Sequence, residues 1–373
     1  MSTRILVAPD KFKGSLSSSE VAAALATGLR SAGRPVDAVE MPLADGGDGS
    51  VEVALRAGFR RQPVRVTRAD GTDGVADIAL RGGTAVVEAA LICGPTGGPP
   101  SPLTATSRGV GQAIQQAVGH GAGTVVLALG GSASTDGGAG LLAALGARMS
   151  DRAGNPLAPG GGPLTRLHRI TRVGRVGLGS ARLVLAADVD SPLLGERGAA
   201  VVFGPQKGAT PDEVARLEAG LTQLVERLDR AGLPASACAR RPGAGAAGGL
   251  GFAAFLLGAR YRGGARVFLE LAGFDAAVRT ADLVVTGEGS LDEQTLAGKL
   301  ASVVAVESGA HGVPAIAVAG RCLLDDPALA GFARCYALVS REPGCARDRT
   351  LSARTLTAIG REIGQSHYPR RVG

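Results

Sequence analysis

The 373-residue sequence contains no tryptophan, and aromatic residues make up only 3% of it. Proteins that bind single-stranded nucleic acid need aromatic side chains on which bases can stack. The net charge of +7 permits anionic partners, but the arginines are dispersed along the chain and form no basic arm. The composition therefore argues against a nucleic-acid partner and is compatible with a small anionic ligand.

Long apolar runs are also missing. The apolar run at residues 251–259 has nine residues, whereas a membrane-spanning helix needs about 20. The first strand-like run begins at Arg4 and is soon followed by Asp10, which leaves no room for the apolar core of a signal peptide. We therefore expect a cytoplasmic protein without a membrane partner.

Cysteine and histidine are too few and too scattered for most redox or zinc chemistry. The five cysteines are an odd number without a C-x-x-C pair, which favours reduced thiols. The four histidines show no metal-ligand spacing.

Lysine is rare as well. Of the 40 basic residues only four are lysines, and all four lie in glycine-flanked loops: Lys11, Lys13, Lys207 and Lys299. In an arginine-rich chain, a position that stays lysine is a candidate for a role that needs a compact charge on a slim stem. Such a charge beside bare backbone N–H groups suits a phosphate. We therefore predict phosphate contacts for these loops, with chance retention in a biased genome as the alternative.

One unit recurs along the chain: an apolar strand, a loop of Gly with Asp or Ser, and a helix. The first copy has a strand at 4–8, a loop to Leu16, and a capping box from Ser17 to Glu20 that begins a helix. Further strands are predicted at 36–41, 124–129, 183–187, 282–286 and 313–319. Further helices are predicted at 50–57, from Gly138 to about Leu145, and at 211–230. This alternation indicates an α/β protein with largely parallel sheets.

One segment departs from that pattern. Residues 62–67, 75–80 and 84–89 read as short strands joined by turns, which predicts an antiparallel insertion. We expect a middle domain, residues 69–274, inserted into a first domain built from residues 1–68 and 275–373.

The loops of the recurring unit all follow strands, and ligands of parallel sheets bind at the carboxyl ends of strands. We therefore expect these loops to converge in one crevice. The loop Gly130–Gly138 places glycines, hydroxyls and Asp136 before a helix, an arrangement that cradles anions. A plain helix-capping loop is the alternative. Two weaker motifs fail: Gly243–Gly248 follows no strand, and Gly298-Lys299 lacks the other parts of a P-loop.

Carboxylates stand at several of these strand ends: Asp10, Asp45, Asp48, Asp188, Asp190, Glu288 and Asp292. Magnesium prefers one or two carboxylates together with substrate oxygens. No histidine stands in a motif that would activate Ser132 as a nucleophile. Acidic clusters, glycine loops and isolated lysines without a covalent nucleophile indicate phosphoryl transfer.

Seven stretches in order along the chain resemble the type-1 glycerate kinase family. They are Ala8–Ser17, Ala44–Gly49, Gly130–Gly140, Ala187–Leu193, Phe203–Gly208, Pro242–Gly251 and Val285–Asp292 with Gly298-Lys299. The resemblance spans nearly the whole chain. It departs from the family pattern at Lys11, where serine is common, at Ala187, where many relatives have cysteine, and in residues 89–100.

The resemblance implies ATP- and Mg²⁺-dependent phosphorylation of D-glycerate, usually to 2-phosphoglycerate and less often to 3-phosphoglycerate. It also implies a fold class of two α/β domains: a flavodoxin-like parallel-sheet domain from both chain ends, and an inserted mixed-sheet domain resembling the restriction-endonuclease fold. We expect a monomer or a homodimer. The alternatives are a non-catalytic sensor of a small hydroxy acid and a kinase for another hydroxy acid.

Roles are assigned to the matching residues from their chemistry. Asp188 is the expected base, and Lys207 and Lys13 are expected to stabilise developing phosphate charge. The expected metal ligands are Asp45, Glu288 and Asp292. The expected nucleotide or phosphate contacts are Gly46, Gly47, Gly287 and Lys299. The expected substrate contacts are Asp10, Ser15, Arg108, Ser132 and Asp136, with Arg108 holding the glycerate carboxylate through a bidentate pair.

Overall fold

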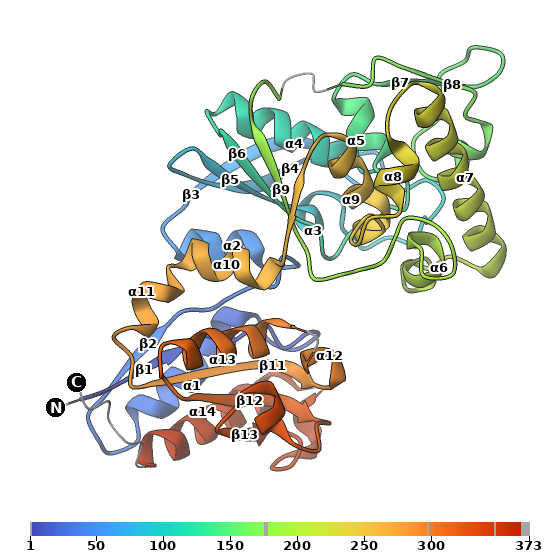
Figure 1. The fold of residues 1–373 in the computed structure, drawn as a ribbon. Coiled ribbons are helices and arrows are strands. Elements are labelled where there is room, and N and C mark those ends of the chain that lie inside the picture. Colours follow the sequence, from blue (N-terminus) through green and yellow to red (C-terminus); the bar gives the residue numbers. More distant parts are fainter. Residues whose placement is uncertain (1, 175–177, 297, 347, 367–373) are drawn as a thin grey trace. The chain divides into compact units, whose positions relative to one another are not determined.

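The computed structural model describes residues 2–174, 178–296, 298–346 and 348–366 (Figure 1). The chain divides into two compact units. Unit 1 comprises residues 1–45, 52–57 and 264–373, and unit 2 comprises residues 46–51 and 58–263. The domain division predicted from the sequence, with boundaries after residues 68 and 274, stays a prediction.

Unit 1 contains a five-stranded parallel sheet in the order β13-β12-β11-β1-β2. Its strands are β1 (Thr3–Val7), β2 (Val36–Glu40), β11 (Leu283–Leu291), β12 (Ala315–Cys322) and β13 (Arg334–Ala337). Numbered along this unit alone, the order is 2-1-3-4-5, which is the flavodoxin-like order. In this order successive strands are added on one side of β1 and then on the other, so β1 and β11 flank the topological switch point. Ligands are expected at the carboxyl ends of these two strands.

Helices cover both faces of this sheet, each over its own apolar cluster. On one face, α1 (Ser18–Arg30) and α14 (Arg349–Gln365) bury Leu25 and Ile359. On the other, α10 (Gly264–Ala272), α11 (Phe274–Val278) and α13 (Leu300–Ala310) bury Leu269 and Val304. The capping box predicted at Ser17 and Glu20 is confirmed, with both of its reciprocal hydrogen bonds formed at the start of α1.

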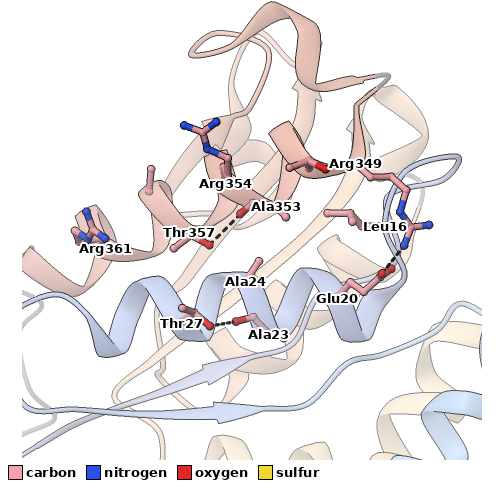
Figure 2. A pocket seen from close by; sticks show the side chains of 12 residues that line it. Leu16, Glu20, Ala23, Ala24, Thr27, Arg349, Ala353, Arg354, Thr357 and Arg361 are labelled. Atoms are coloured by element: carbon pink, nitrogen blue, oxygen red, sulfur yellow. Dashed lines mark hydrogen bonds and ion pairs between the residues drawn. The ribbon is translucent and has the colours of Figure 1, made fainter.

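Helices α1 and α14 lie side by side (Figure 2). They approach closely because glycine stands at their contact. A Cβ at Gly28 would lie 2.0 Å from the carbonyl oxygen of Thr357, and a Cβ at Gly360 would lie 2.3 Å from that of Leu25.

Unit 2 contains a six-stranded mixed sheet in the order β10-β9-β6-β5-β4-β3. Its strands are β3 (Arg60–Thr67), β4 (Asp73–Arg81), β5 (Thr84–Glu88), β6 (Thr124–Ala128), β9 (Arg182–Ala186) and β10 (Arg260–Arg262). The pairs β3–β4 and β4–β5 are antiparallel, as predicted. From β5 through β6 and β9 to β10 the sheet is parallel. A separate antiparallel pair joins β7 (Arg148–Ser150) to β8 (Arg169–Thr171).

The helices of unit 2 enclose one large apolar core, which includes Ile114, Leu221 and Phe252. They are α3 (Ala89–Cys93), α4 (Arg108–Gly119), α5 (Ala139–Ala144), α6 (Ala199–Phe203), α7 (Pro211–Arg230), α8 (Ala235–Ala239) and α9 (Ala246–Leu256). The remaining helices are α2 (Ser50–Arg56), α12 (Glu293–Leu296) and four 3₁₀ turns, at Gly162–Arg166, Pro205–Lys207, Pro327–Ala330 and Pro343–Ala346. The predicted fold class, two α/β parts with one parallel and one mixed sheet, is confirmed.

Two predicted strand ends are wrong. The segment Gly287–Leu291, expected as a loop, continues strand β11, and β12 runs past Gly320 to Cys322. The two strands remain paired along this extension. Glycine is required there because the strands approach closely: a Cβ at Gly287 would lie 1.8 Å from the carbonyl oxygen of Val318.

Among the residues that the structure describes, no helix has both the length and the apolar character that a membrane crossing requires.

Candidate functional site

Three carboxylates of unit 1 stand at the carboxyl ends of neighbouring parallel strands. Asp10 follows β1, Asp45 follows β2, and Glu288 lies in the last part of β11. The backbone N–H of Asp10 donates to the carbonyl oxygen of Gly287 over 2.8 Å, which joins the first loop to β11. These residues therefore lie at the switch point between β1 and β11, where ligands of this sheet order bind.

A lysine neutralises part of this acidic group. The Nζ of Lys11 lies 3.2 Å from Oδ1 of Asp45 and 4.0 Å from Oδ1 of Asp10. The backbone N–H of Lys11 also donates to Oδ1 of Asp10 over 2.7 Å. Lys11 is thus held against two predicted site residues.

A second lysine holds the other acidic pair of unit 1. The Nζ of Lys299 lies 2.9 Å from Oδ1 of Asp292 and 3.8 Å from Oε2 of Glu288. The buried hydroxyl of Thr295 donates to Oε1 of Glu288 over 2.8 Å and accepts from the backbone N–H of Asp292. Thr295 therefore fixes the geometry between Glu288 and Asp292, a role that the sequence analysis missed.

Burial makes two of these carboxylates hard to ionise in the unliganded protein. It raises the pKa of Asp10 to about 7, and the charge of Asp45 raises this pKa further against the opposing charge of Lys11. Burial likewise raises the pKa of Glu288 to about 7, although the Thr295 hydrogen bond and Lys299 lower it. This acidic group therefore carries more carboxylates than its two lysines can compensate.

That excess of carboxylates fits a divalent cation. Magnesium is bound by hard oxygen donors and keeps several positions for water and substrate phosphate. Within the described ranges, no group of three or more His, Cys, Asp or Glu side chains forms a ready-made metal cage. The residues therefore fit a magnesium ion that arrives with phosphate oxygens better than an ion held by the protein alone.

The other predicted residues of unit 1 differ in their contacts and exposure. The Lys13 side chain is exposed, and its backbone N lies 3.3 Å from where a Cβ of Gly289 would be. The hydroxyl of Ser15 donates to the hydroxyl of Ser352 on α14 over 3.3 Å. The predicted substrate role of Ser15 and the nucleotide role of Gly287 stay predictions.

The remaining predicted residues belong to unit 2. Strands β5, β6, β9 and β10 run parallel, so their carboxyl ends share one edge of the sheet. Three predicted or neighbouring parts lie at that edge: Glu88 at the end of β5, the loop Gly130–Gly138 after β6, and Asp188 after β9. The crevice expected from the sequence draws on residues of both units and stays a prediction.

Lys207 lies beside the loop Gly130–Gly138. Its Nζ donates to the carbonyl oxygen of Ser134 over 2.6 Å and to the hydroxyl of Ser132 over 3.2 Å. Burial lowers the pKa of Lys207 to about 8, while Cys93 and Asp136 act in the opposite direction. The structure thus brings together Lys207 and Ser132, which the sequence placed 75 residues apart.

Asp136 organises the loop from inside. Its buried carboxylate accepts hydrogen bonds from the backbone N–H and the hydroxyl of Ser107, both at 2.9 Å, and from the N–H groups of Gly138 and Gly140. Burial raises the pKa of Asp136 despite these bonds. Arg108 follows Ser107 at the start of α4 with an exposed side chain. The contacts tie Asp136 to the N-terminal end of the helix that presents Arg108.

The predicted phosphate contacts Gly46 and Gly47 pack on the first glycine of the same loop. The N–H of Gly130 donates to the carbonyl oxygen of Gly46 over 3.3 Å, and a Cβ at Gly130 would lie 2.5 Å from Cα of Gly47. Glu88 holds the next turn, because its buried carboxylate accepts from the N–H groups of Gly49 and Val51. The sequence analysis missed Glu88, although a carboxylate ending an apolar strand was a signal that could have found it.

Asp188, the predicted base, is exposed at the end of β9. A Cβ at Gly263, which follows β10, would lie 3.4 Å from its Oδ1. That distance is an ordinary van der Waals contact, so the Asp188 carboxylate lies beside the residue that follows β10.

A groove of about 840 Å³ between α1 and α14 lies apart from these residues (Figure 2). Its lining includes Glu20, which is paired with Arg349, together with Arg354 and Arg361, but no predicted site residue. The groove follows from the small side chains at the helix contact.

Comparison with known proteins identifies the family. The model of the glycerate kinase family matches residues 5–367. A glycerate kinase of Bacillus subtilis is 39% identical over 334 residues, covering 87% of this chain and 87% of the relative. A glycerate 2-kinase of Escherichia coli is 38% identical, covering 87% and 86%. The crystal structure of a protein provisionally assigned as glycerate kinase 2 in Salmonella typhimurium LT2 matches with a TM-score of 0.79 and 35% identity, covering 98% of this chain and 100% of that one.

Proposed function

This chain belongs to the glycerate kinase family, and we propose that it transfers the terminal phosphoryl group of ATP to D-glycerate with Mg²⁺ as cofactor. The observation that carries the proposal is the group of carboxylates, two of them buried, and paired lysines at the switch point of the unit 1 sheet. Phosphoryl transfer is catalysed mainly by positioning and charge neutralisation, which such a group provides.

In unit 1, Asp45, Glu288 and Asp292 would hold the magnesium ion. When bound, the ion would neutralise charge on the phosphates. Lys299 and Lys13 would contact phosphate oxygens. Binding of a cation would also favour the ionised forms of the buried carboxylates, whose pKa values burial otherwise raises.

In unit 2, Asp188 would accept the proton of the attacking hydroxyl, and Lys207 would stabilise charge that develops on the transferred group. Arg108 would hold the glycerate carboxylate, and Ser132 would bind a hydroxyl beside Lys207. Asp136 would contribute by shaping the loop, because the protein's own N–H groups and the Ser107 hydroxyl surround its carboxylate.

We favour 2-phosphoglycerate as the product over 3-phosphoglycerate. The support is the resemblance to the glycerate 2-kinase of Escherichia coli, at 38% identity. Cytoplasmic location and a monomeric or homodimeric state stay expectations from the sequence.

The test is release of ADP by the purified protein with D-glycerate, ATP and Mg²⁺, compared with reactions that contain EDTA or other small hydroxy acids. We expect turnover with glycerate that requires the metal. Binding of glycerate without ATP consumption would indicate a sensor, and faster turnover of another acid would indicate a different acceptor.

The assignment of Asp188 is tested by Asp188→Asn, which keeps the shape of the side chain and removes its basicity. We expect kcat to fall by roughly 10²-fold or more, the scale of a positioned general base. Turnover within a few fold of wild type would show that another group accepts the proton.

A further inference from the structure

Tyr261 lies on β10, beside the loop that carries Asp188 and Asp190. Its hydroxyl donates to the carbonyl oxygen of Val189, the residue between the two acids, over 3.4 Å. Burial raises the pKa of Tyr261 to about 12, and the charges of Asp190 and Asp188 add to this effect. The phenol therefore keeps its proton, and its donor ability, throughout the physiological pH range.

The loop Ala187–Leu193 is otherwise anchored through its backbone on either side of Val189. The N–H of Ala187 donates to Arg262, the carbonyl oxygen of Ser191 accepts from Gly245, and the N–H of Leu193 donates to Ala239. Between the first two of these anchors, Tyr261 supplies a side-chain hydrogen bond to the Val189 carbonyl in the part of the chain that the structure describes.

The Tyr261 ring is itself held in place. A Cβ at Gly243 would lie 2.6 Å from Cε2 of Tyr261, so the ring packs directly on a glycine backbone. The Phe255 ring lies on another side, with centroids 6.4 Å apart. Backbone pairing of Tyr261 with Leu185 of β9 fixes the residue against the strand that ends at Asp188.

We propose that Tyr261 is a positioning residue for phosphoryl transfer. Its hydrogen bond to the Val189 carbonyl sets the position and orientation of the neighbouring Asp188 carboxylate. The inference rests on the proposed role of Asp188 as base. A base acts only within hydrogen-bond reach of the proton that it accepts, so a small displacement of its loop slows the reaction. Tyr261 touches no reacting atom in this proposal.

The first test is Tyr261→Phe, which removes one hydroxyl and keeps the packed ring. We expect kcat to fall about 2- to 10-fold, the equivalent of one neutral hydrogen bond, with KM for glycerate within about twofold and little change in Tm. Tyr336→Phe, a tyrosine of unit 1, is the matched control and should leave kcat unchanged. A lower Tm with unchanged kcat would mean that the hydroxyl has only a structural role, and would overturn the proposal.

The second test is a double-mutant cycle with Asp188→Asn. If Tyr261 acts through Asp188, adding Tyr261→Phe to Asp188→Asn causes no further loss of kcat. An equal loss in both backgrounds would show that Tyr261 acts independently of Asp188 and would overturn the inference. If Asp188→Asn lowers kcat strongly and Tyr261→Phe does not, the Tyr261 proposal alone is contradicted. If Asp188→Asn keeps full activity, Asp188 is not the base, and both proposals are contradicted.

Discussion

At the scale of single residues, unit 1 holds two carboxylates that are costly to ionise. Asp10 and Glu288 are buried, and each has a pKa raised to about 7 chiefly because water cannot reach the anion. Each is placed against a lysine that only partly compensates the charge of its neighbours. The cost of keeping these carboxylates ionised is what a bound cation would offset.

These shifts predict how the stability of the unliganded protein depends on pH. Because the folded-state pKa values lie above those of the unfolded chain, the folded state binds more protons between about pH 4 and pH 7. These two groups stabilise the folded state fully at pH values below their pKa values in the unfolded chain. This contribution is lost as pH rises through about 7. We expect Tm to fall by roughly 2–6 °C between pH 5 and pH 8 from these two groups.

The measurement is thermal unfolding of the unliganded protein across this pH range for wild type and Asp10→Asn. The variant should show a shallower fall, because one of the two groups no longer titrates. Asp70→Asn is the control: hydrogen bonding to Thr72 lowers the pKa of this exposed carboxylate, so its removal should leave the slope unchanged. A slope identical in wild type and Asp10→Asn would contradict the assignment.

Lys207 provides the second prediction at this scale. Its Nζ donates to both the Ser134 carbonyl and the Ser132 hydroxyl, a pair of contacts that a wider planar guanidinium would not reproduce. We expect Lys207→Arg to lower kcat by about 10-fold or more, as for a misplaced charged hydrogen bond. Steady-state kinetics beside an exposed control, Arg197→Lys, measure this. Unchanged kinetics would mean that charge alone suffices and that the scarcity of lysine has no functional meaning at this position.

At the scale of elements, the loop after β6 is shaped by an irregular turn within α9. Ala247, Gly248 and Gly249 all have left-handed backbone angles there. The N–H of Gly137 donates to the carbonyl oxygen of Gly248, and a Cβ at Gly248 would lie 2.0 Å from the carbonyl oxygen of Ser134. The residue that Lys207 holds from one side is thus contacted by this turn from the other.

Replacing Gly248 tests this arrangement. Gly248→Ala adds a left-handed strain and a backbone clash, so we expect it to lower the free energy of unfolding by about 2–5 kcal/mol. Ala247→Gly is the matched control, because its φ of 53° already strains alanine. The relief of that strain and the greater freedom of unfolded glycine are both about 1 kcal/mol, so stability should change little. Urea unfolding compares the two, and equal effects would refute the account.

Some elements could be predicted from sequence because their causes are local. The capping box of α1 and the long amphipathic helix α7 depend on side chains three or four residues apart, and both are confirmed. The end of β11 could not be predicted, because its glycines are explained by the close approach of β12, a strand distant in sequence. The left-handed turn at Ala247 likewise depends on a loop more than 100 residues away.

At the scale of the whole molecule, motif order along the chain carried the family and the fold class, since seven separate stretches occur in the family order. The pairing of carboxylates with lysines was not visible, because Lys11 reaches Asp45 and Lys299 reaches Glu288 only after the sheet forms. Ser107 was missed for the same reason, because it acts by a hydrogen bond to Asp136, 29 residues away along the chain. Glu88 and its partner Val51 are 37 residues apart, although the place of Glu88 at the end of an apolar strand was a signal. Most of the charged residues could be picked out from the sequence, and the structure shows the ion pairs and hydrogen bonds that hold them.

The account as a whole is tested most directly by identifying the product. The protein is incubated with D-glycerate, ATP and Mg²⁺, and the phosphorus NMR spectrum is recorded with proton coupling. We expect a phosphomonoester doublet, because in 2-phosphoglycerate the phosphate is attached to a carbon bearing one proton. A triplet would place the phosphate on the terminal carbon and contradict the choice of hydroxyl. No phosphomonoester above the enzyme-free control would contradict phosphoryl transfer to glycerate itself.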